Sequence, residues 1–113
     1  MTDPASGEPT PTQRLFGDFA PALTDLTDRV LYDEVWERAE LAPRDRSLVT
    51  VAALVAGGNT EQLAFHLALA RENGVTEAEL VEAITHLAFY TGWPRVMSAM
   101  AVAKTVFGAN GGE

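Results

Sequence analysis

Residues 43–58 read PRDRSLVTVAALVAGG, and this stretch decides the fold class. Its Val and Thr content would also suit a buried strand. Its length, the proline at its start and the glycine pair at its end favour a helix. Proline is accepted in a first helical turn, and glycine commonly follows the last one. The stretch therefore predicts a buried helix.

The segments on either side also have proline where a helix would begin or glycine where one would end. Pro21 suits the first turn of a helix that runs to about Tyr32. No strand-like alternation and no internal repeat occurs, so we expect an all-α bundle with short, glycine-marked corners and a last helix that ends before Gly108. Two later pairs have the spacing of capping boxes, namely Asn59 with Gln62 and Thr76 with Glu79.

The 113 residues suit a single domain. Residues 1–12 are polar, so we expect a disordered leader there, a helical domain over 13–108 and a frayed tail over 109–113. The leader lacks the basic start and apolar centre of a signal peptide. The longest apolar stretch, 48–56, is far shorter than the roughly 20 residues that span a bilayer. We expect a cytoplasmic protein with no membrane partner.

Composition narrows the classes of function. The net charge is −8 and no run of Lys and Arg occurs, which argues against nucleic acid as a partner. The absence of cysteine excludes disulfides and thiol redox chemistry, and two histidines without metal-motif spacing indicate no metal site. Apolar residues make up 47% of the chain, and many of the expected helices are apolar on more than one face. That pattern suggests helices packed on several sides, or a subunit that buries a face against copies of itself.

Histidine titrates near neutral pH unaided, so His66 and His86 are the first candidates for acid–base chemistry. His66 lies on a largely apolar segment, where a packed histidine with one satisfied hydrogen bond is an equally open interpretation. His86 follows Glu82 by four residues and precedes Tyr90 by four, which places all three on one helical face. Such a set suits catalysis, although an ordinary surface Glu–His pair is the commoner case.

Arg46 lies in the first turn of the 43–58 helix, where a cation opposes the helix dipole. A compensating anion is expected. It is either a bound carboxylate, held by two parallel hydrogen bonds, or a protein carboxylate such as Glu37 or Glu40. Aromatic residues such as Trp93 suit the wall of an apolar pocket, although they more often belong to a core.

Five motifs occur in one order along the chain. They are Val35-Trp36-x-Arg38-x-x-Leu41, Arg44-x-Arg46-Ser47-Leu48-Val49-Thr50-Val51-Ala52, Leu63-x-x-His66-Leu67, Asn73-Gly74-Val75-Thr76-x-x-Glu79, and Tyr90-x-Gly92-x-Pro94 with Ser98-Ala99. In this order and spacing they resemble the carboxymuconolactone decarboxylase family. The resemblance implies an all-α bundle like that of alkyl hydroperoxidase D, assembled as an obligate homo-oligomer, commonly a trimer or hexamer.

The resemblance also implies chemistry. One branch of the family is peroxidase-like and uses Cys-x-x-Cys-x-x-x-His. Here Asn59 and Gln62 stand at the cysteine positions, so the peroxidase reaction is excluded. The other branch acts on small lactone carboxylates in aromatic catabolism and uses no cofactor, and His66, Arg46 and Ser47 match its pattern.

The chain departs from that second branch at three positions. Gln62 stands where its members tend to carry Glu, while Met97 and Ala101 replace an expected Asn and His. The scaffold is kept, and several residues of the kind that line a pocket have changed. The departures therefore bear on the substrate rather than on the fold.

Three functions are consistent with these residues. The first is a cofactor-free carboxy-lyase acting on a small lactone carboxylate of the 4-carboxymuconolactone type. The second is a related enzyme that isomerises, hydrolyses or cyclises another small oxygenated ring. The third is a non-catalytic oligomeric binding protein with structural histidines. For the first, the catalytic set is His66, His86 and Tyr90, and the substrate-binding set is Arg46, Ser47, Gln62 and Trp93.

Overall fold

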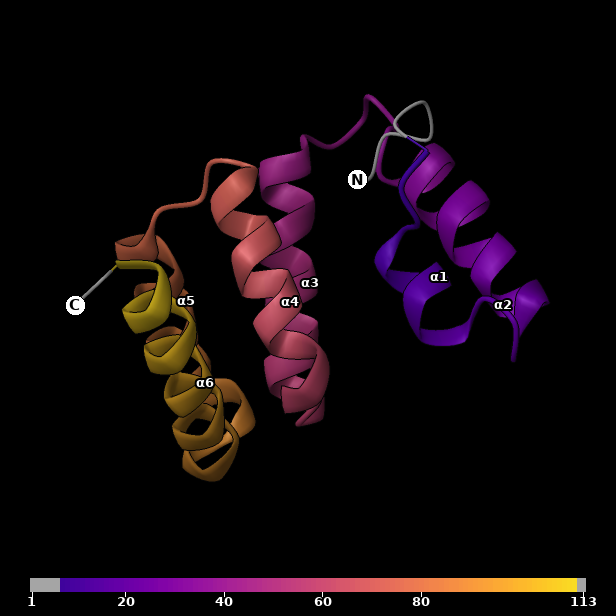
Figure 1. The fold of residues 1–113 in the computed structure, drawn as a ribbon. Coiled ribbons are helices and arrows are strands. Elements are labelled where there is room, and N and C mark those ends of the chain that lie inside the picture. The colour runs from indigo at the N-terminus through magenta and orange to yellow at the C-terminus, as the bar shows by residue number, and fades with distance from the viewer. Residues whose placement is uncertain (1–6, 112–113) are drawn as a thin grey trace. The chain divides into compact units, whose positions relative to one another are not determined.

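A computed structural model describes residues 7–111, and it describes side chains as far as residue 108. All regular structure in these residues is helical, as the sequence predicts. The chain divides after Leu41 into two compact units (Figure 1). A single domain over 13–108 stays a prediction from the sequence. The division falls between the Trp36 and Arg44 motifs, which follow each other closely in the sequence.

The first unit contains three short helical segments. They are α1 (Pro11–Phe16), α2 (Pro21–Asp25) and η2 (Leu26–Val35). The helix α1 begins inside the leader for which the sequence predicts disorder, because Thr10 and Gln13 form a capping box there. Residues 1–6 of that leader lie outside the described residues. Thr10 also donates a hydrogen bond of 2.8 Å to Asp28, which ties α1 to η2.

The segment η2 is a π-helix, a form that the helix predicted from Pro21 to about Tyr32 did not specify. Its wider turns bond a backbone N–H to the carbonyl five residues back, as the Trp36 N–H does to Leu31 at 2.9 Å. Tyr32 stacks on Trp36 with ring centroids 5.7 Å apart, and burial raises the pKa of the Tyr32 hydroxyl. Among the described residues of this unit only Thr24 is buried.

The second unit packs four longer helices. They are α3 (Pro43–Gly57), α4 (Thr60–Glu72), α5 (Glu77–Thr91) and α6 (Trp93–Gly111). The 43–58 stretch is therefore a helix, as predicted. Both α3 and α6 pack against α4 and α5, so that α4 and α5 occupy opposite corners of the unit.

The last helix is longer than the sequence predicts. It passes through Gly108 and reaches Gly111, inside the predicted frayed tail, and residues 112–113 lie outside the described residues. A glycine inside a helix costs only about 1 kcal/mol relative to alanine, so one glycine does not by itself end a helix.

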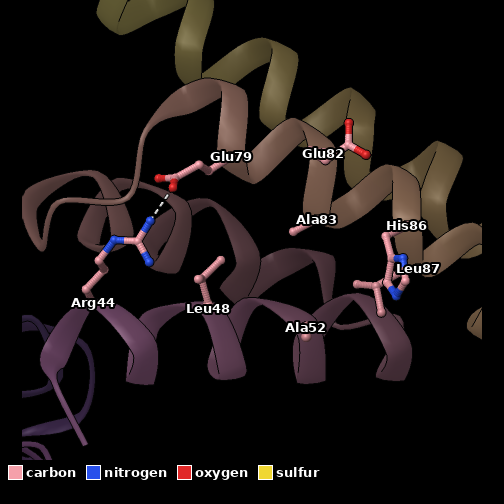
Figure 2. Close-up of a pocket in the computed structure, with 8 residues that line it drawn as sticks. All are labelled: Arg44, Leu48, Ala52, Glu79, Glu82, Ala83, His86 and Leu87. Atoms are coloured by element: carbon pink, nitrogen blue, oxygen red, sulfur yellow. Dashed lines mark hydrogen bonds and ion pairs between the residues drawn. The ribbon is translucent and has the colours of Figure 1, made fainter.

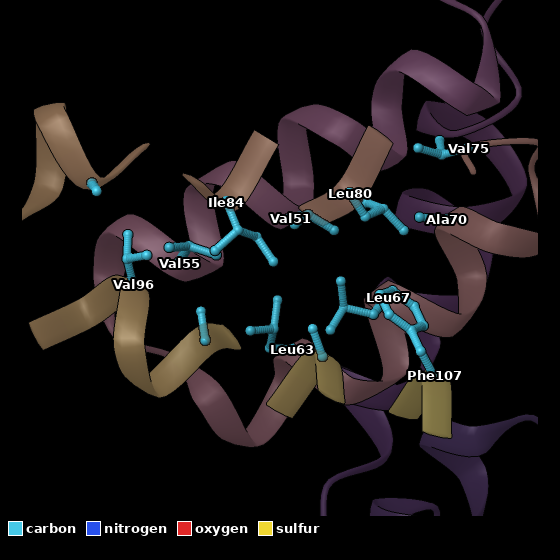
Figure 3. Close-up of a cluster of buried hydrophobic side chains, with 13 residues drawn as sticks. Val51, Val55, Leu63, Leu67, Ala70, Val75, Leu80, Ile84, Val96 and Phe107 are labelled. Atoms are coloured by element: carbon cyan, nitrogen blue, oxygen red, sulfur yellow. The ribbon is translucent and has the colours of Figure 1, made fainter. Parts of the chain in front are cut away.

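The hydrophobic core lies between these four helices (Figure 3). Leu63 and Leu67 of α4 and Leu80 and Ile84 of α5 are all fully shielded from solvent. Small residues on α6 let the helices approach closely, since Ala99 and Ala103 are also in the core. The other buried members are Val51, Val55, Ala70, Val75, Ala88, Val96 and Phe107.

The corner between α3 and α4 depends on a left-handed glycine. Gly58 has φ +72°, a conformation that side chains with a Cβ rarely adopt. The Asn59 N–H then reaches back to the Leu54 carbonyl at 2.9 Å. Arg95 of α6 donates a 2.8 Å hydrogen bond to the Ala56 carbonyl, which places a cation at the negative end of α3.

The two predicted capping boxes have different outcomes. Thr76 and Glu79 bond reciprocally at the start of α5, as predicted, with distances of 3.0 and 2.9 Å. The prediction for Asn59 and Gln62 is wrong, because the Asn59 side chain makes no capping hydrogen bond. That side chain lies instead over Gly57, where a Cβ would collide with its amide oxygen.

Candidate active site

The first turn of α3 carries two arginines and a serine from the sequence motif. Ala42 at its N-cap provides no side-chain hydrogen bond, so this turn lacks a local cap. Ser47 is fully buried, and its Oγ accepts a 3.0 Å hydrogen bond from Asn73 at the end of α4. Arg46 is partly buried, and its Nε is shielded from solvent. The turn therefore presents a partly desolvated cation beside a buried polar link.

His66 lies in the middle of α4 and is partly buried. Burial lowers the pKa of its imidazole, so the neutral form predominates at neutral pH. Its Nδ1 is shielded from solvent, and the Phe65 ring meets the imidazole edge-on at 5.1 Å. Gln62 lies one turn earlier and is exposed. An anion bound beside this imidazole would raise its pKa again, because opposite charge favours the protonated form.

A groove of about 490 Å³ runs between α3 and α5 (Figure 2). Arg44 forms an ion pair with Glu79 at one end of the groove, and His86 lies at the other end. Most of the lining between them is apolar, because α3 contributes Leu48 and Ala52 while α5 contributes Ala83 and Leu87. An apolar groove with polar groups at its ends is typical of small-molecule sites.

His86 and Tyr90 lie side by side, as their four-residue spacing predicts, with ring centroids 5.1 Å apart. Glu82 lines the same groove, but no hydrogen bond or ion pair joins its carboxylate to His86 in the described part of the chain. Tyr90 is 76% exposed, and Trp93 packs edge-on against Phe89 at 5.3 Å. The predicted aromatic wall is therefore a surface feature of the described chain rather than part of its core.

The structure separates the two histidines. His66 belongs to α4 and His86 to α5, which occupy opposite corners and flank α3 from two sides. His66 is not among the residues that line the groove, whereas His86 shares the groove with Arg44. Arg46 and Ser47 belong to the same helical turn as Arg44.

Sequence reasoning does not single out Arg44 and Glu79 as site residues. The sequence does contain a signal for them, because on each helix the residues that line the groove recur every fourth position. They are Arg44, Leu48 and Ala52 on α3, and Glu79, Ala83 and Leu87 on α5. Residues spaced by four lie along one helical face, and alanine in such a row leaves space. Sequence spacing does not tell which two helices bring their rows together.

Two absences apply to the described residues, 7–111. No group of three or more His, Asp or Glu side chains in this range is placed to hold a metal ion. In the same range, no helix has both the length and the apolar character needed to cross a membrane.

The fold and the site define a small, cysteine-free, all-helical domain with arginines and histidines arranged around α3. The model of the carboxymuconolactone decarboxylase family matches residues 21–105. The chain therefore belongs to the carboxymuconolactone decarboxylase family. The match covers the second half of the first unit and nearly all of the second unit.

Two curated relatives are similar to this chain in sequence. A 4-carboxymuconolactone decarboxylase from Acinetobacter baylyi is 41% identical over 90 residues, which cover 80% of this chain and 67% of the relative. A nitrosuccinic acid decarboxylase from Metarhizium robertsii is 39% identical over 80 residues, which cover 71% of this chain and 56% of the relative. The chain thus spans about two thirds of the first relative and little more than half of the second.

Proposed function

We propose that this chain is a decarboxylase that removes CO2 from a small carboxylate without a cofactor. The observation that carries the proposal is the 41% identity to a 4-carboxymuconolactone decarboxylase. The second relative is also named as a decarboxylase, and its named substrate is a different small acid. The reaction type is common to both relatives, whereas the substrate differs. A lactone carboxylate of the 4-carboxymuconolactone type is the first candidate substrate.

Decarboxylation sets three demands on a site. The C–C bond to the carboxylate breaks, CO2 leaves, and the electron pair stays on the carbon, where a conjugated lactone carbonyl can take it up as an enolate. A cation must hold the carboxylate, donors must stabilise the enolate oxygen, and an acid must protonate the carbon. A proton from solvent then restores the acid.

The residues of the site are suited to these demands. Arg46, a partly buried guanidinium, is assigned to the carboxylate. His66 is assigned to proton delivery. Burial lowers the pKa of its imidazole, and a bound anion would raise that pKa again and so favour the protonated form. His86 or Tyr90 is assigned to the enolate oxygen. Both belong to α5, on the other side of α3 from His66, so they reach the same substrate only from a second copy of the chain. Gln62, Ser47 and Trp93 complete the proposed binding set. Ser47 is fully buried, so it acts on the site through its hydrogen bond with Asn73 rather than by touching the substrate.

The test is a spectrophotometric assay with 4-carboxymuconolactone generated in situ. The wild type is compared with His66→Ala and His86→Ala, and light scattering and a thermal melt confirm that each variant is folded. We expect turnover by the wild type and at least a hundredfold loss in His66→Ala, the order of a lost acid–base group. Unchanged kcat in a folded His66→Ala variant would remove His66 from the mechanism.

Lack of turnover by a folded wild type would contradict the lactone substrate. The same assay would then be run with nitrosuccinate, the acid in the name of the second relative. Lack of CO2 release from both acids would overturn the proposal and favour the non-catalytic alternative. A loss of thermal stability in His66→Ala would then assign this histidine a structural role, as that alternative predicts.

We also propose that the chain assembles as a trimer or hexamer. Large apolar side chains gather where α5 meets α6, since Phe89 is 75%, Trp93 55% and Met97 65% exposed. Such a patch on a small protein commonly marks an interface. Light scattering on the wild type and on Trp93→Ser, with the exposed Thr85→Ala as control, is expected to show a smaller species for Trp93→Ser alone.

A cytoplasmic location stays a prediction from the sequence.

A further inference from the structure

The first turn of α3 is poorly stabilised by its own residues. Its N-cap, Ala42, makes no side-chain capping bond, and it carries Arg44 and Arg46 at the end where cations oppose the helix dipole. Asp45 offsets one of these charges, since its carboxylate oxygen lies 3.5 Å from a guanidinium nitrogen of Arg44. A turn of this kind frays readily unless other elements hold it. Yet this turn carries the guanidinium assigned to the substrate carboxylate.

Two side chains from the corner between α4 and α5 reach this turn. Asn73 donates a 3.0 Å hydrogen bond to the buried Oγ of Ser47. Glu79 forms an ion pair with Arg44 (Figure 2). These contacts join two sequence motifs that lie 26 and 35 residues apart, and they bracket Arg46 on both sides within one turn.

The corner that supplies these contacts is itself fixed. Gly74 has φ +99°, and the Val75 N–H bonds to the Ala70 carbonyl at 2.9 Å, so α4 ends in a defined left-handed turn. Val75 is 1% exposed and anchors the turn in the core. Asn73, the last residue before this turn, is thereby held facing α3.

The Glu79 carboxylate is fixed in the same way. It accepts a 2.9 Å hydrogen bond from the Thr76 N–H, while the Thr76 hydroxyl accepts one of 3.0 Å from the Glu79 N–H. The Thr76 N–H, and after it Arg44, hold the pKa of Glu79 below its ordinary value. The Glu79 carboxylate therefore stays ionised at neutral pH and pairs there with the Arg44 guanidinium.

We infer that Asn73 and Glu79 are positioning residues that hold the first turn of α3 so that Arg46 can receive the substrate carboxylate. The inference rests on the proposed function, because it concerns how Arg46 performs the role assigned there. It gives the Asn73-Gly74-Val75-Thr76-x-x-Glu79 motif a task that the reaction itself does not explain. The motif holds the arginine motif in place and is not itself part of the reacting site.

The kinetic test compares Glu79→Gln with Glu77→Gln. Glutamine at position 79 can still accept from the Thr76 N–H but loses the ion pair to Arg44. Glu77→Gln removes the same charge from the same turn and breaks a pair with Arg71 at 3.6 Å, away from α3. With 4-carboxymuconolactone as substrate, we expect KM to rise about tenfold in Glu79→Gln with kcat within about twofold, the pattern of lost substrate binding.

The control variant is expected to keep the wild-type KM. In an Arg46→Met background, Glu79→Gln is expected to change KM by less than about twofold, because the group that it positions is gone. An equal rise in KM in both backgrounds, or an equal effect of Glu77→Gln, would overturn the inference.

A second measurement does not depend on activity. The Arg46 Nε is shielded from solvent, so exchange of its Nε–H, followed by NMR on ¹⁵N-labelled protein, reports how firmly the turn is held. We expect exchange about tenfold faster in Asn73→Ala and Glu79→Gln, and unchanged in Glu77→Gln. Unchanged exchange in the first two variants would overturn the positioning role. If the wild type fails to decarboxylate any acid tested, the proposed function fails, and the exchange rates still decide this inference.

Discussion

The side-chain amide of Asn73 donates a 3.0 Å hydrogen bond to the Oγ of Ser47, which lies 26 residues earlier in the chain and is fully buried. The bond joins the end of α4 to the start of α3. It satisfies a hydroxyl that water does not reach, which makes the pair a structural link as well as part of the candidate site.

Removing the Ser47 hydroxyl is expected to destabilise the fold. In Ser47→Ala the partly buried Asn73 amide loses its acceptor, so the free energy of unfolding should fall by about 1–3 kcal/mol. Ser98→Ala is the matched control, because Ser98 is exposed on α6. Urea denaturation followed by circular dichroism measures both. Equal midpoints for the two variants would show that the bond contributes nothing to stability.

Substitutions at two glycines should differ in cost. Gly58 and Gly74 both have positive φ, so alanine at either position is expected to cost about 1–2 kcal/mol of unfolding free energy. A Cβ on Gly58 would also lie 2.9 Å from a guanidinium nitrogen of Arg95, whereas a Cβ on Gly74 would meet nothing within 4 Å. Gly58→Ala should therefore be the more costly change.

The Arg95 contribution can be separated in a double variant. The excess cost of Gly58→Ala is expected to disappear in an Arg95→Ala background, because the displaced guanidinium and its bond to the Ala56 carbonyl are already absent. Thermal melts of the four proteins in this cycle are sufficient. Strictly additive losses would mean that Arg95 moves aside without cost.

Stability should depend on pH through His66. Burial lowers its folded-state pKa, so the unfolded chain takes up the proton first as the pH falls. Stability is therefore complete above the unfolded-state pKa, near 6.5, and is lost as the pH falls from there toward the folded-state value. In His66→Gln the melting temperature should therefore change less with pH between about pH 7 and pH 5 than it does in the wild type.

The acidic side of the same profile provides a control. Glu79 also has a lowered pKa, and its contribution is lost only below its ordinary value of about 4.5. The difference in stability between wild type and Glu79→Gln should therefore be constant through the neutral region and shrink only below that pH. A wild-type profile that coincides with that of His66→Gln down to pH 5 would contradict the assignment to His66.

The core of the second unit should be sensitive to truncation. Leu67 is fully shielded from solvent between the four helices, so Leu67→Ala is expected to cost about 2–5 kcal/mol of unfolding free energy (Figure 3). Leu15 of α1 is 71% exposed, and Leu15→Ala is expected to change stability by less than about 0.5 kcal/mol. A large loss for Leu15→Ala would reveal that an assembly buries this residue.

Features within one helix could be predicted from the sequence because they depend on local geometry. Proline and glycine marked both ends of α3, since the bonding pattern of a helix end requires those conformations. The Thr76–Glu79 box and the contact between His86 and Tyr90 followed from spacings of three and four residues. The ordered motifs likewise predicted the family that the matched model confirms.

Other local features were not predictable in this way. The π-helical bonding of η2 has no signature in its composition. Asn59 has a residue type and a spacing that suit a cap. Its side chain lies instead over Gly57, which has no Cβ to block it. In both cases the residue types allow two conformations, and the surrounding backbone selects one.

By itself the sequence determined the helical fold, the family and the residue types available for chemistry, because periodicity, capping and motif order act along the chain. Only the tertiary structure decided which of those residues meet. It joined Arg44 to Glu79 and Ser47 to Asn73, and it set His66 and His86 on opposite sides of α3. The physical reason is that contacts between helices depend on how the whole buried core packs, and spacing within one helix carries no information about its neighbour.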